Sequence, residues 1–201
     1  AYDSLKESEK GLAEAQKMAH VGSWVWDRAT DKAYWSDELY RIFGLNPQEP
    51  GANYNEFLNY IHPEDRVDMD NAHKKALNGK PYNLEYRIVL ANGEERTVHM
   101  ECKIIFDENN IPIRLNGIIQ DITERKKSEE KIQLLANIVE SSNDAIGTMS
   151  LEGVITSWNK GAEQVYGYSA EEILGKTASF LAPPHLSEET KKLTEKVIKG
   201  E

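Results

Sequence analysis

The chain has 201 residues, of which 39% are hydrophobic and 29% charged, and its formal net charge is −10 at pH 7. This composition is typical of a soluble globular chain with one large or two small domains, and no stretch of about 20 apolar residues is available to span a membrane. The acidic balance, without a basic stripe, argues against a nucleic-acid partner, and the single cysteine, Cys102, excludes an intrachain disulfide and a cysteine-based zinc site.

The first segment, residues 1–19, is expected to be a linker helix, because side chains recur at alternating steps of three and four residues. These are Tyr2, Leu5, Glu9, Leu12, Gln16 and Ala19. Residues 21–26 and 32–35 are rich in aromatic and β-branched side chains and flank a turn-forming stretch. They therefore predict a β-hairpin.

Three helices are expected after this hairpin. Ser36 is placed to cap the first, which ends at Gly44, and Asn53 is placed to cap the second. The third and longest helix is expected to begin at Pro63, since proline suits the first position of a helix.

Alternating apolar and polar residues predict three further strands, over residues 82–90, 98–106 and 113–122. Asn92-Gly93 joins the first two of these strands, and this dipeptide favours a tight hairpin turn. The order of two strands, several short helices and three strands indicates an α+β fold. We expect a five-stranded antiparallel sheet with helices on one side.

The last strand passes directly into a charged helical pattern, without a glycine or proline between them. Asp121 and Thr123 can bond to neighbouring backbone as helix caps do, so we expect Asp121-Ile122-Thr123 to fix the angle of the join. Residues 123–142 then predict a connecting helix with a coiled-coil-like seam of about two heptads. Its members are Arg125, Ser128, Ile132, Leu135, Val139 and Ser142. We assign signal relay to Asp121, Thr123 and Arg125.

The chain contains an internal repeat. Trp35 begins "WSDELYRIFGLNPQE", and Trp158, 123 residues later, begins "WNKGAEQVYGYSAEE". Residues 143–201 therefore predict a second unit that starts with a hairpin over 145–149 and 154–158.

Three helices are expected after this second hairpin, beginning near Asn159, Ser169 and Ser187. Counterparts of the last three strands of the first unit are absent from the sequence. The edge of residues 154–158 or that of residues 145–149 is therefore expected to be unpaired, with Ile155 and Trp158 poorly covered.

A catalytic or metal site receives little support from the sequence. His62, Glu64 and Asp65 have the components of an acid–base site, but no nucleophile is paired with them. A helix start with acids in its first turn explains the same residues. The histidines lack metal-ligand spacing, so we assign no metal and expect this chain to be catalytically silent.

Several phrases together resemble a PAS domain with its PAC segment: "AHVGSWVWD", "YWSDELYRIFG", "HPEDR", "YRIVLANGEERTV" and "GIIQDITERK". The stretch "VESSNDAIGTMSLEGVITSWNKGAEQVYGYSAEEILGK" resembles the first half of a second PAS domain. The resemblance implies a linker helix over 1–19, a PAS domain over 20–122, a connecting helix over 123–142 and the start of a second PAS domain over 143–201.

The resemblance also implies a function. In this family, tandem copies stand upstream of signalling outputs, often histidine kinases. We therefore expect a sensory relay module of a two-component histidine kinase, with the kinase domain downstream in a longer parent chain and a homodimer formed through the flanking helices. We expect a cytoplasmic location, because a chain without disulfides suits a reducing compartment. This chain is expected to make no membrane contact, although its parent is free to be anchored elsewhere.

The PAS fold encloses a small pocket, for which Trp35, Tyr86, His99 and Asn116 are candidate residues. Haem-binding relatives place a histidine about eleven residues before the glycine that ends the long helix, and this chain has Asp68 and Glu189 there. Flavin-bonding relatives need Asn-Cys-Arg at a helix start, whereas Cys102 lies in an expected strand. We predict no cofactor, while an unidentified small molecule remains possible.

Two alternatives stay open at this point. One is a redox or gas sensor that carries flavin or haem, in which Trp24, Trp26 and Trp35 would contact a non-covalent flavin. The other is a PAS module that controls a different output, such as a cyclic-dinucleotide enzyme.

Overall fold

The computed structural model describes residues 2–47, 53–181 and 196. The chain divides into two compact units, Ala1–Lys127 and Ser128–Glu201. The helix expected near Ser187, and with it Glu189, lies outside the described residues. Among the helices that are described, none combines the length and the apolar character needed to cross a membrane.

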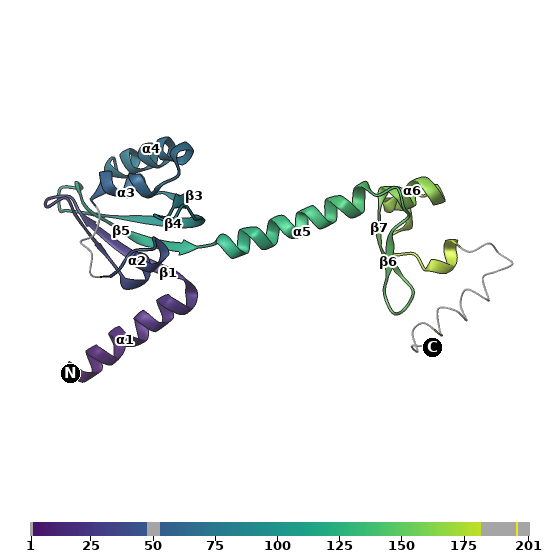
Figure 1. Ribbon diagram of the computed structural model, residues 1–201, viewed down its shortest axis with the longest axis horizontal. Coiled ribbons are helices and arrows are strands. Elements are labelled where there is room, and N and C mark those ends of the chain that lie inside the picture. Colours follow the sequence, from purple (N-terminus) through teal and green to yellow (C-terminus); the bar gives the residue numbers. More distant parts are fainter. Residues whose placement is uncertain (1, 48–52, 182–195, 197–201) are drawn as a thin grey trace. The chain divides into compact units, whose positions relative to one another are not determined.

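The first unit contains a five-stranded sheet with neighbours in the order β2-β1-β5-β4-β3, and every pairing is antiparallel. Helices α3 and α4 lie on one side of this sheet (Figure 1). The expected α+β architecture is therefore confirmed. Its elements are α1 (Tyr2–Ala19), β1 (Val21–Asp27), β2 (Lys32–Trp35), α2 (Asp37–Ile42), α3 (Tyr54–Tyr60), η1 (Pro63–Asp65), α4 (Arg66–Leu77), β3 (Asn83–Val89), β4 (Glu95–Phe106), β5 (Pro112–Asp121) and α5 (Thr123–Ser141).

Two of the expected helix caps are present. The Ser36 hydroxyl accepts a hydrogen bond from the Leu39 amide at the start of α2. Asn53 and Glu56 form a reciprocal capping box at the start of α3. These bonds satisfy amides that have no partner inside the helix, which is why the two helices begin at these residues.

The expected start of the long helix is wrong by three residues. Pro63 begins a 3-10 turn, and the α-helix begins only at Arg66. The His62 amide donates to the Arg87 carbonyl at 2.9 Å, and the Asp65 carboxylate accepts from the Arg87 amide at 2.8 Å. These bonds to β3 hold residues 62–65 against the sheet. A regular α-helix therefore begins only after this segment, at Arg66.

The inner face of the sheet packs tightly against α2 where β1 carries Gly22. A Cβ atom at Gly22 would lie 2.5 Å from Leu39 Cβ, so only glycine lets the helix approach the strand this closely. Leu39 and Phe43 are completely or almost completely buried in this contact. The position of α2 over the sheet is thus fixed by packing and leaves little freedom to slide.

The second unit repeats the beginning of the first, with β6 (Gly147–Met149), β7 (Ile155–Trp158), α6 (Lys160–Tyr166), α7 (Ala170–Ile173) and η2 (Ala178–Leu181). Asn159 and Ser169 cap α6 and α7, as the sequence predicts. Gly44 after α2 and Gly167 after α6 have nearly the same positive φ, +70° and +77°. The repeat is therefore present in the structure as well as in the sequence.

The expectation that Ile155 is poorly covered is wrong, and of the two strand edges named as unpaired, that of β7 is paired. Ile155 is 3% exposed. Its amide donates to the Lys176 carbonyl at 2.8 Å, and its carbonyl accepts from the Gly175 amide at 3.0 Å. The segment that follows α7 therefore covers the edge of β7, whereas β5 of the first unit joins its sheet through β1, the counterpart of β6. Trp158 is half-buried.

Candidate functional site

A cavity lies between the sheet and the helices of the first unit. Its walls carry six aromatic side chains: Trp24, Trp26, Trp35, Tyr54, Phe57 and Tyr82. Aliphatic side chains and one imidazole complete the lining: Ala33, Leu39, Met100, Ile119 and His73. About 40 Å³ is open to the centres of water molecules, where one water needs about 10–15 Å³. The cavity as it stands has room for a very small molecule.

His73 of α4 forms part of this wall and is 8% exposed. Its ring stacks on Tyr54 with centroids 3.7 Å apart, and it meets Trp26 edge-on at 5.6 Å. Burial lowers the pKa of His73, and the nearby carboxylates of Asp70 and Asp31 only partly oppose this. The imidazole is therefore neutral at pH 7 and presents one donor and one acceptor nitrogen.

Two polar atoms in and beside the cavity lack partners among the described residues. They are the indole nitrogen of Trp24, a residue whose side chain forms part of the lining, and the hydroxyl of Tyr86, which is buried on β3. Burial raises the pKa of Tyr86 far above its ordinary value. An unpartnered buried donor costs about 1–3 kcal/mol, so the Trp24 nitrogen marks a place where a hydrogen-bond acceptor would be stabilised.

The four candidate pocket residues do not lie together. Trp35 lines the cavity, and Tyr86 is buried on the same face of the sheet without being part of the lining. His99 and Asn116 lie on the opposite face, where His99 Nε2 meets Asn83 Oδ1 at 2.6 Å. They alternate with the buried Val98, Met100, Leu115 and Ile119.

At the join between sheet and helix, Asp121 makes several connections. Its Oδ1 accepts from the Thr123 amide at 2.9 Å and from the Thr123 hydroxyl. The Thr97 amide on β4 donates to Thr123 Oγ1 at 3.0 Å. The Asp121 amide donates to the His20 carbonyl at the end of α1. The first turn of α5 is thus bound to its own strand, to β4 and, through Asp121, to α1.

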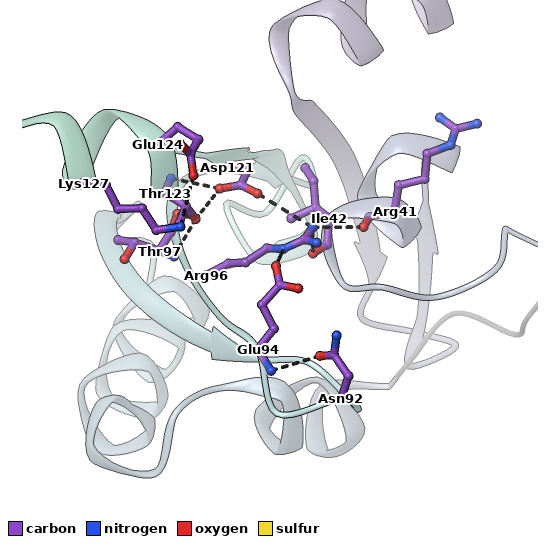
Figure 2. A network of polar contacts seen from close by, with 10 residues as sticks. All are labelled: Arg41, Ile42, Asn92, Glu94, Arg96, Thr97, Asp121, Thr123, Glu124 and Lys127. Atoms are coloured by element: carbon purple, nitrogen blue, oxygen red, sulfur yellow. Dashed lines mark hydrogen bonds and ion pairs between the residues drawn. The ribbon is translucent and has the colours of Figure 1, made fainter.

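Arg96 on β4 extends this network to α2, as Figure 2 shows. Its Nη1 donates to the Ile42 carbonyl at 3.0 Å and to the Arg41 carbonyl at 3.3 Å, at the end of α2. The same nitrogen lies 3.8 Å from Asp121 Oδ2, while Nε is bonded to Glu94. One guanidinium therefore bridges the end of α2 and the start of α5.

Charged residues hold the next turn of α5 as well. Arg125 Nη2 lies 3.3 Å from Glu85 Oε1 on β3, and Lys126 lies 2.5 Å from the other oxygen of the same carboxylate. The hydrogen bond from Lys126 is the main reason that the pKa of Glu85 is lowered. The three residues that the sequence suggests for relay, Asp121, Thr123 and Arg125, therefore all contact the sheet or each other.

The far end of α5 is held by a buried side chain of the second unit. Asn159 Nδ2 donates to the Val139 carbonyl at 2.7 Å and to the Asp144 carbonyl at 3.0 Å. Its Oδ1 accepts from the amides of Ile146 and Ala162. Asn159 therefore caps α6 and binds the last turn of α5 at the same time.

His62, Glu64 and Asp65 do come together, with possible ligand atoms within 4.8 Å of one another. Arg87 already pairs with both carboxylates, at 2.7 Å each. This arginine lowers the pKa of both acids. Their arrangement is that of an ion-pair cluster that fixes the start of α4 to β3.

Sequence reasoning missed three of these residues: His73, Arg96 and Lys126. A signal for His73 was available, because Met69, His73 and Ala76 are four and three residues apart and form the buried stripe of α4. Arg96 gave no such signal, since it contacts carbonyls more than 50 residues away in the sequence.

Comparisons with known proteins agree with this architecture. A family model described as PAS fold matches residues 32–119, and a second model with the same description matches residues 139–201. A solved sensory box histidine kinase/response regulator from Burkholderia thailandensis E264 superposes with a TM-score of 0.52 at 28% identity, over 63% of this chain and 95% of that one.

Curated relatives carry sensor and kinase names. The blue-light-activated histidine kinase of Brucella abortus (strain 2308) is 35% identical over 120 residues, which is 60% of this chain and 24% of that protein. Sensor protein FixL of Bradyrhizobium diazoefficiens is 27% identical over 168 residues, 81% of this chain and 33% of that protein. The chain thus spans only a quarter to a third of these relatives.

The two family matches together take in most of the chain, and the five-stranded sheet and the structural repeat agree with them. This chain belongs to the PAS family and carries two PAS units in tandem.

Proposed function

We propose that this chain is the sensory relay module of a histidine kinase, and that changes at the cavity of the first unit reach α5 through the Asp121–Thr123 join. The names of the relatives support the kinase as output, and the kinase domain would belong to the same, longer protein. The chain itself would bind and transmit without catalysis. With its one free thiol, Cys102, it would work in the cytoplasm.

The bridge made by Arg96 is the observation that carries this proposal (Figure 2). Trp35 in the cavity wall packs on Phe43, which ends α2, with ring centroids 5.0 Å apart. Arg96 binds the carbonyl of Ile42, the residue before Phe43, and also faces Asp121. A shift of the cavity wall thus has a contiguous route of contacts to the first turn of α5.

The join is built to transmit such a shift. The chain has no glycine between Asp121 and the end of α5, and the first turn of the helix is bonded to the sheet. Charge-assisted hydrogen bonds are shorter and stronger than neutral ones, so they resist deformation. A rigid join carries displacement into the helix, where a flexible loop would absorb it.

The output helix offers a surface for pairing. Ile132, Leu135 and Val139 on α5 are 67%, 53% and 41% exposed and follow the seam spacing. A coiled-coil contact with the α5 of a second copy would cover them. The proposal therefore includes a homodimer through this helix.

The name of the Brucella relative points to light as an input of that protein, but the described residues of this chain do not fit a cysteine-bonded flavin. Cys102 lies in the middle of β4, and burial raises the pKa of its thiol to about 11. Asp68 stands in α4 where haem-binding relatives are expected to have histidine. The proposal includes neither flavin nor haem.

The test compares Asp121→Ala and Asp121→Asn in the full-length gene product, with autophosphorylation by ATP as the readout. Removal of the cap should cost the first unit about 0.5–2 kcal/mol of stability and change the basal rate. The asparagine retains an acceptor for the Thr123 amide but loses the charge that faces Arg96, so its effect should be intermediate.

Asp107→Ala is the matched control. Asp107 Oδ1 also accepts two backbone amides, those of Asn109 and Ile111, but at the turn between β4 and β5. This variant should lose similar stability and keep wild-type phosphorylation. Unchanged phosphorylation in Asp121→Ala, or the same change in Asp107→Ala, would contradict the relay.

A further inference from the structure

We propose that His73 is a pH-sensitive contact, which holds α4 and α3 against the sheet at neutral pH and releases them when its imidazole is protonated in mildly acidic solution. The first unit then responds to protons as a signal of their own. This inference goes beyond the proposed relay, because α4 can open whether or not the opening reaches α5.

His73 is one of three side chains that attach α4 to the rest of the first unit. The helix has 12 residues, and its buried members are Met69, His73 and Ala76. Met69 and Ala76 are completely buried and apolar, so their contacts do not depend on pH. The stability of a helix in a protein comes mainly from the packing of its buried face. A charge on His73 therefore weakens the attachment of the whole helix.

The imidazole of His73 joins three elements. It stacks face to face on Tyr54 of α3, with ring centroids 3.7 Å apart, and Trp26 of β1 meets it edge-on at 5.6 Å. The residue is buried, so its ring has little contact with water. A positive charge in this aromatic contact loses its hydration, which is strongly unfavourable unless the charge gains a partner.

The charged groups near the ring already have other partners. On α4 itself, the Asp70 carboxylate lies 2.5 Å from Lys74 Nζ and 3.5 Å from the Tyr54 hydroxyl. In the turn between β1 and β2, Asp31 Oδ1 accepts a hydrogen bond from the indole nitrogen of Trp26 at 2.9 Å. A protonated imidazole must therefore compete for carboxylates that are engaged elsewhere.

These surroundings set the direction of the pH effect. Burial lowers the pKa of His73, and the carboxylates of Asp70 and Asp31 only partly oppose it. The hydroxyls of Tyr54 and Tyr82 carry no charge, since burial raises the pKa of both. An exposed histidine titrates near pH 6.5. The closed form is therefore fully stabilised above pH 6.5 and loses stability as the pH falls from there toward the lower pKa of the closed form.

Two measurements on the full chain test this switch. NMR titration of the histidine rings gives the pKa of His73 directly, with its signal among the five histidines assigned by single substitution. Hydrogen exchange at pH 7.5 and 5.5, corrected for the pH dependence of the intrinsic exchange rate, gives the protection of amides 70–77. The amides of β4 and β5 serve as the reference within the same unit.

We expect the His73 ring to titrate below pH 6.5. The protection of amides 70–77 should fall about three- to tenfold between pH 7.5 and 5.5, since about tenfold is the limit for one proton and an open-form pKa near 6.5. The amides of β4 and β5 should keep their protection, because the sheet does not depend on the charge of His73.

His73→Phe retains an aromatic ring between Tyr54 and Trp26 but cannot be protonated. Its amides 70–77 should therefore be protected equally at pH 7.5 and 5.5. His99→Phe is the matched control, because His99 lies on the opposite face of the sheet and should leave the acid response of α4 as in the wild type.

A His73 ring that titrates at or above pH 6.5 would overturn the proposal, and this measurement on the wild type does not require any variant to fold. Unchanged protection of α4 in acid, the same loss in His73→Phe, or an equal loss in β4 would also overturn it.

The same exchange data separate the switch from the relay. If α4 opens in acid as expected but exchange in the first turn of α5 does not change, the switch stands and the relay fails. If Asp121→Ala alters phosphorylation but α4 shows no acid response, the relay stands and the switch fails.

Discussion

At the scale of single residues, Asp121 shows how one residue can contact several elements through its backbone and its side chain. Its backbone amide bonds to the end of α1, one carboxylate oxygen bonds to Thr123, and the other faces Arg96. A carboxylate has about four acceptor positions, which is why it can hold partners on two sides at once. Its capacity to accept a hydrogen bond from a neighbouring amide could be inferred from sequence, whereas its contact with Arg96 depends on the register of β4 and β5.

The Arg87–Asp65 pair gives a prediction about acid stability. Hydrogen bonds from the Arg87 side chain are the main reason that the pKa of Asp65 is depressed. In the unfolded chain an aspartate titrates near pH 3.9. The stabilisation is therefore fully present above that pH and is lost as the pH falls through the lower, folded-state pKa.

We expect Arg87→Met to lower the free energy of unfolding most above pH 5, and the difference from wild type to shrink as the pH approaches 2. Urea titrations at pH 6, 4 and 2.5 measure this difference. Arg114→Met is the control, since Arg114 is half exposed and lies 3.5 Å from the Asp27 carboxylate, a longer distance than the 2.7 Å of the Arg87–Asp65 pair. A difference that stays constant or grows in acid would contradict the assignment.

At the scale of elements, the strands were predictable because the alternation of apolar and polar residues indicates directly which face of the sheet is buried. The same alternation, followed residue by residue, places His99 on the outer face, since Val98 and Met100 on either side are buried. The start of α4 was not predictable, because the contact of Arg87 with Asp65 competes with helix formation across 22 residues of sequence.

The cavity could not be derived from the sequence either. Its wall combines side chains from β1, β2, α2, α3, α4, β4 and β5, and only the packed fold brings them together. The aromatic residues that form it look like ordinary core residues in the sequence, because both roles demand apolar side chains on the buried face.

Asn159 provides the prediction at this scale. Its repeat counterpart in the first unit is Ser36, which caps α2 with a shorter side chain. Asn159→Ser should therefore retain the cap on the Ala162 amide but lose the bond to the Val139 carbonyl. The loss of this hydrogen bond should cost about 0.5–1.5 kcal/mol of stability in the second unit.

Hydrogen exchange of the full chain measures the outcome. Amides of residues 138–144 should exchange faster in Asn159→Ser, while those of α6 change little. Asn143→Ser makes the same chemical change at an exposed neighbouring position and should match wild type. Slow exchange over 138–144 in Asn159→Ser would show that Asn159 does not hold the end of α5.

At the scale of the whole molecule, the proposed dimer depends on α5. Its exposed apolar seam covers only about two heptads, which is short for a coiled coil, so it should give weak, concentration-dependent association. We expect Leu135→Lys to abolish that association by placing a charge in the seam. Gln133→Lys adds the same charge to an exposed residue outside the seam and should leave it intact.

Sedimentation equilibrium over a range of protein concentrations measures this association. Equal dimerisation of the Leu135→Lys and Gln133→Lys variants would mean that the seam is not the interface. A wild-type chain that stays monomeric at millimolar concentration would remove the α5 dimer from the account.

The central claim is that displacement of the cavity wall reaches α5 through Arg96, and a double-mutant cycle tests it most directly. Trp35→Phe perturbs the wall, Arg96→Met removes the bridge, and the readout is the opening free energy of amides 126–130 by hydrogen exchange. The account predicts that Trp35→Phe changes this free energy only when Arg96 is present, with an interaction term of about 0.5–2 kcal/mol. Additive effects, which mean the same response to Trp35→Phe with and without Arg96, would contradict it.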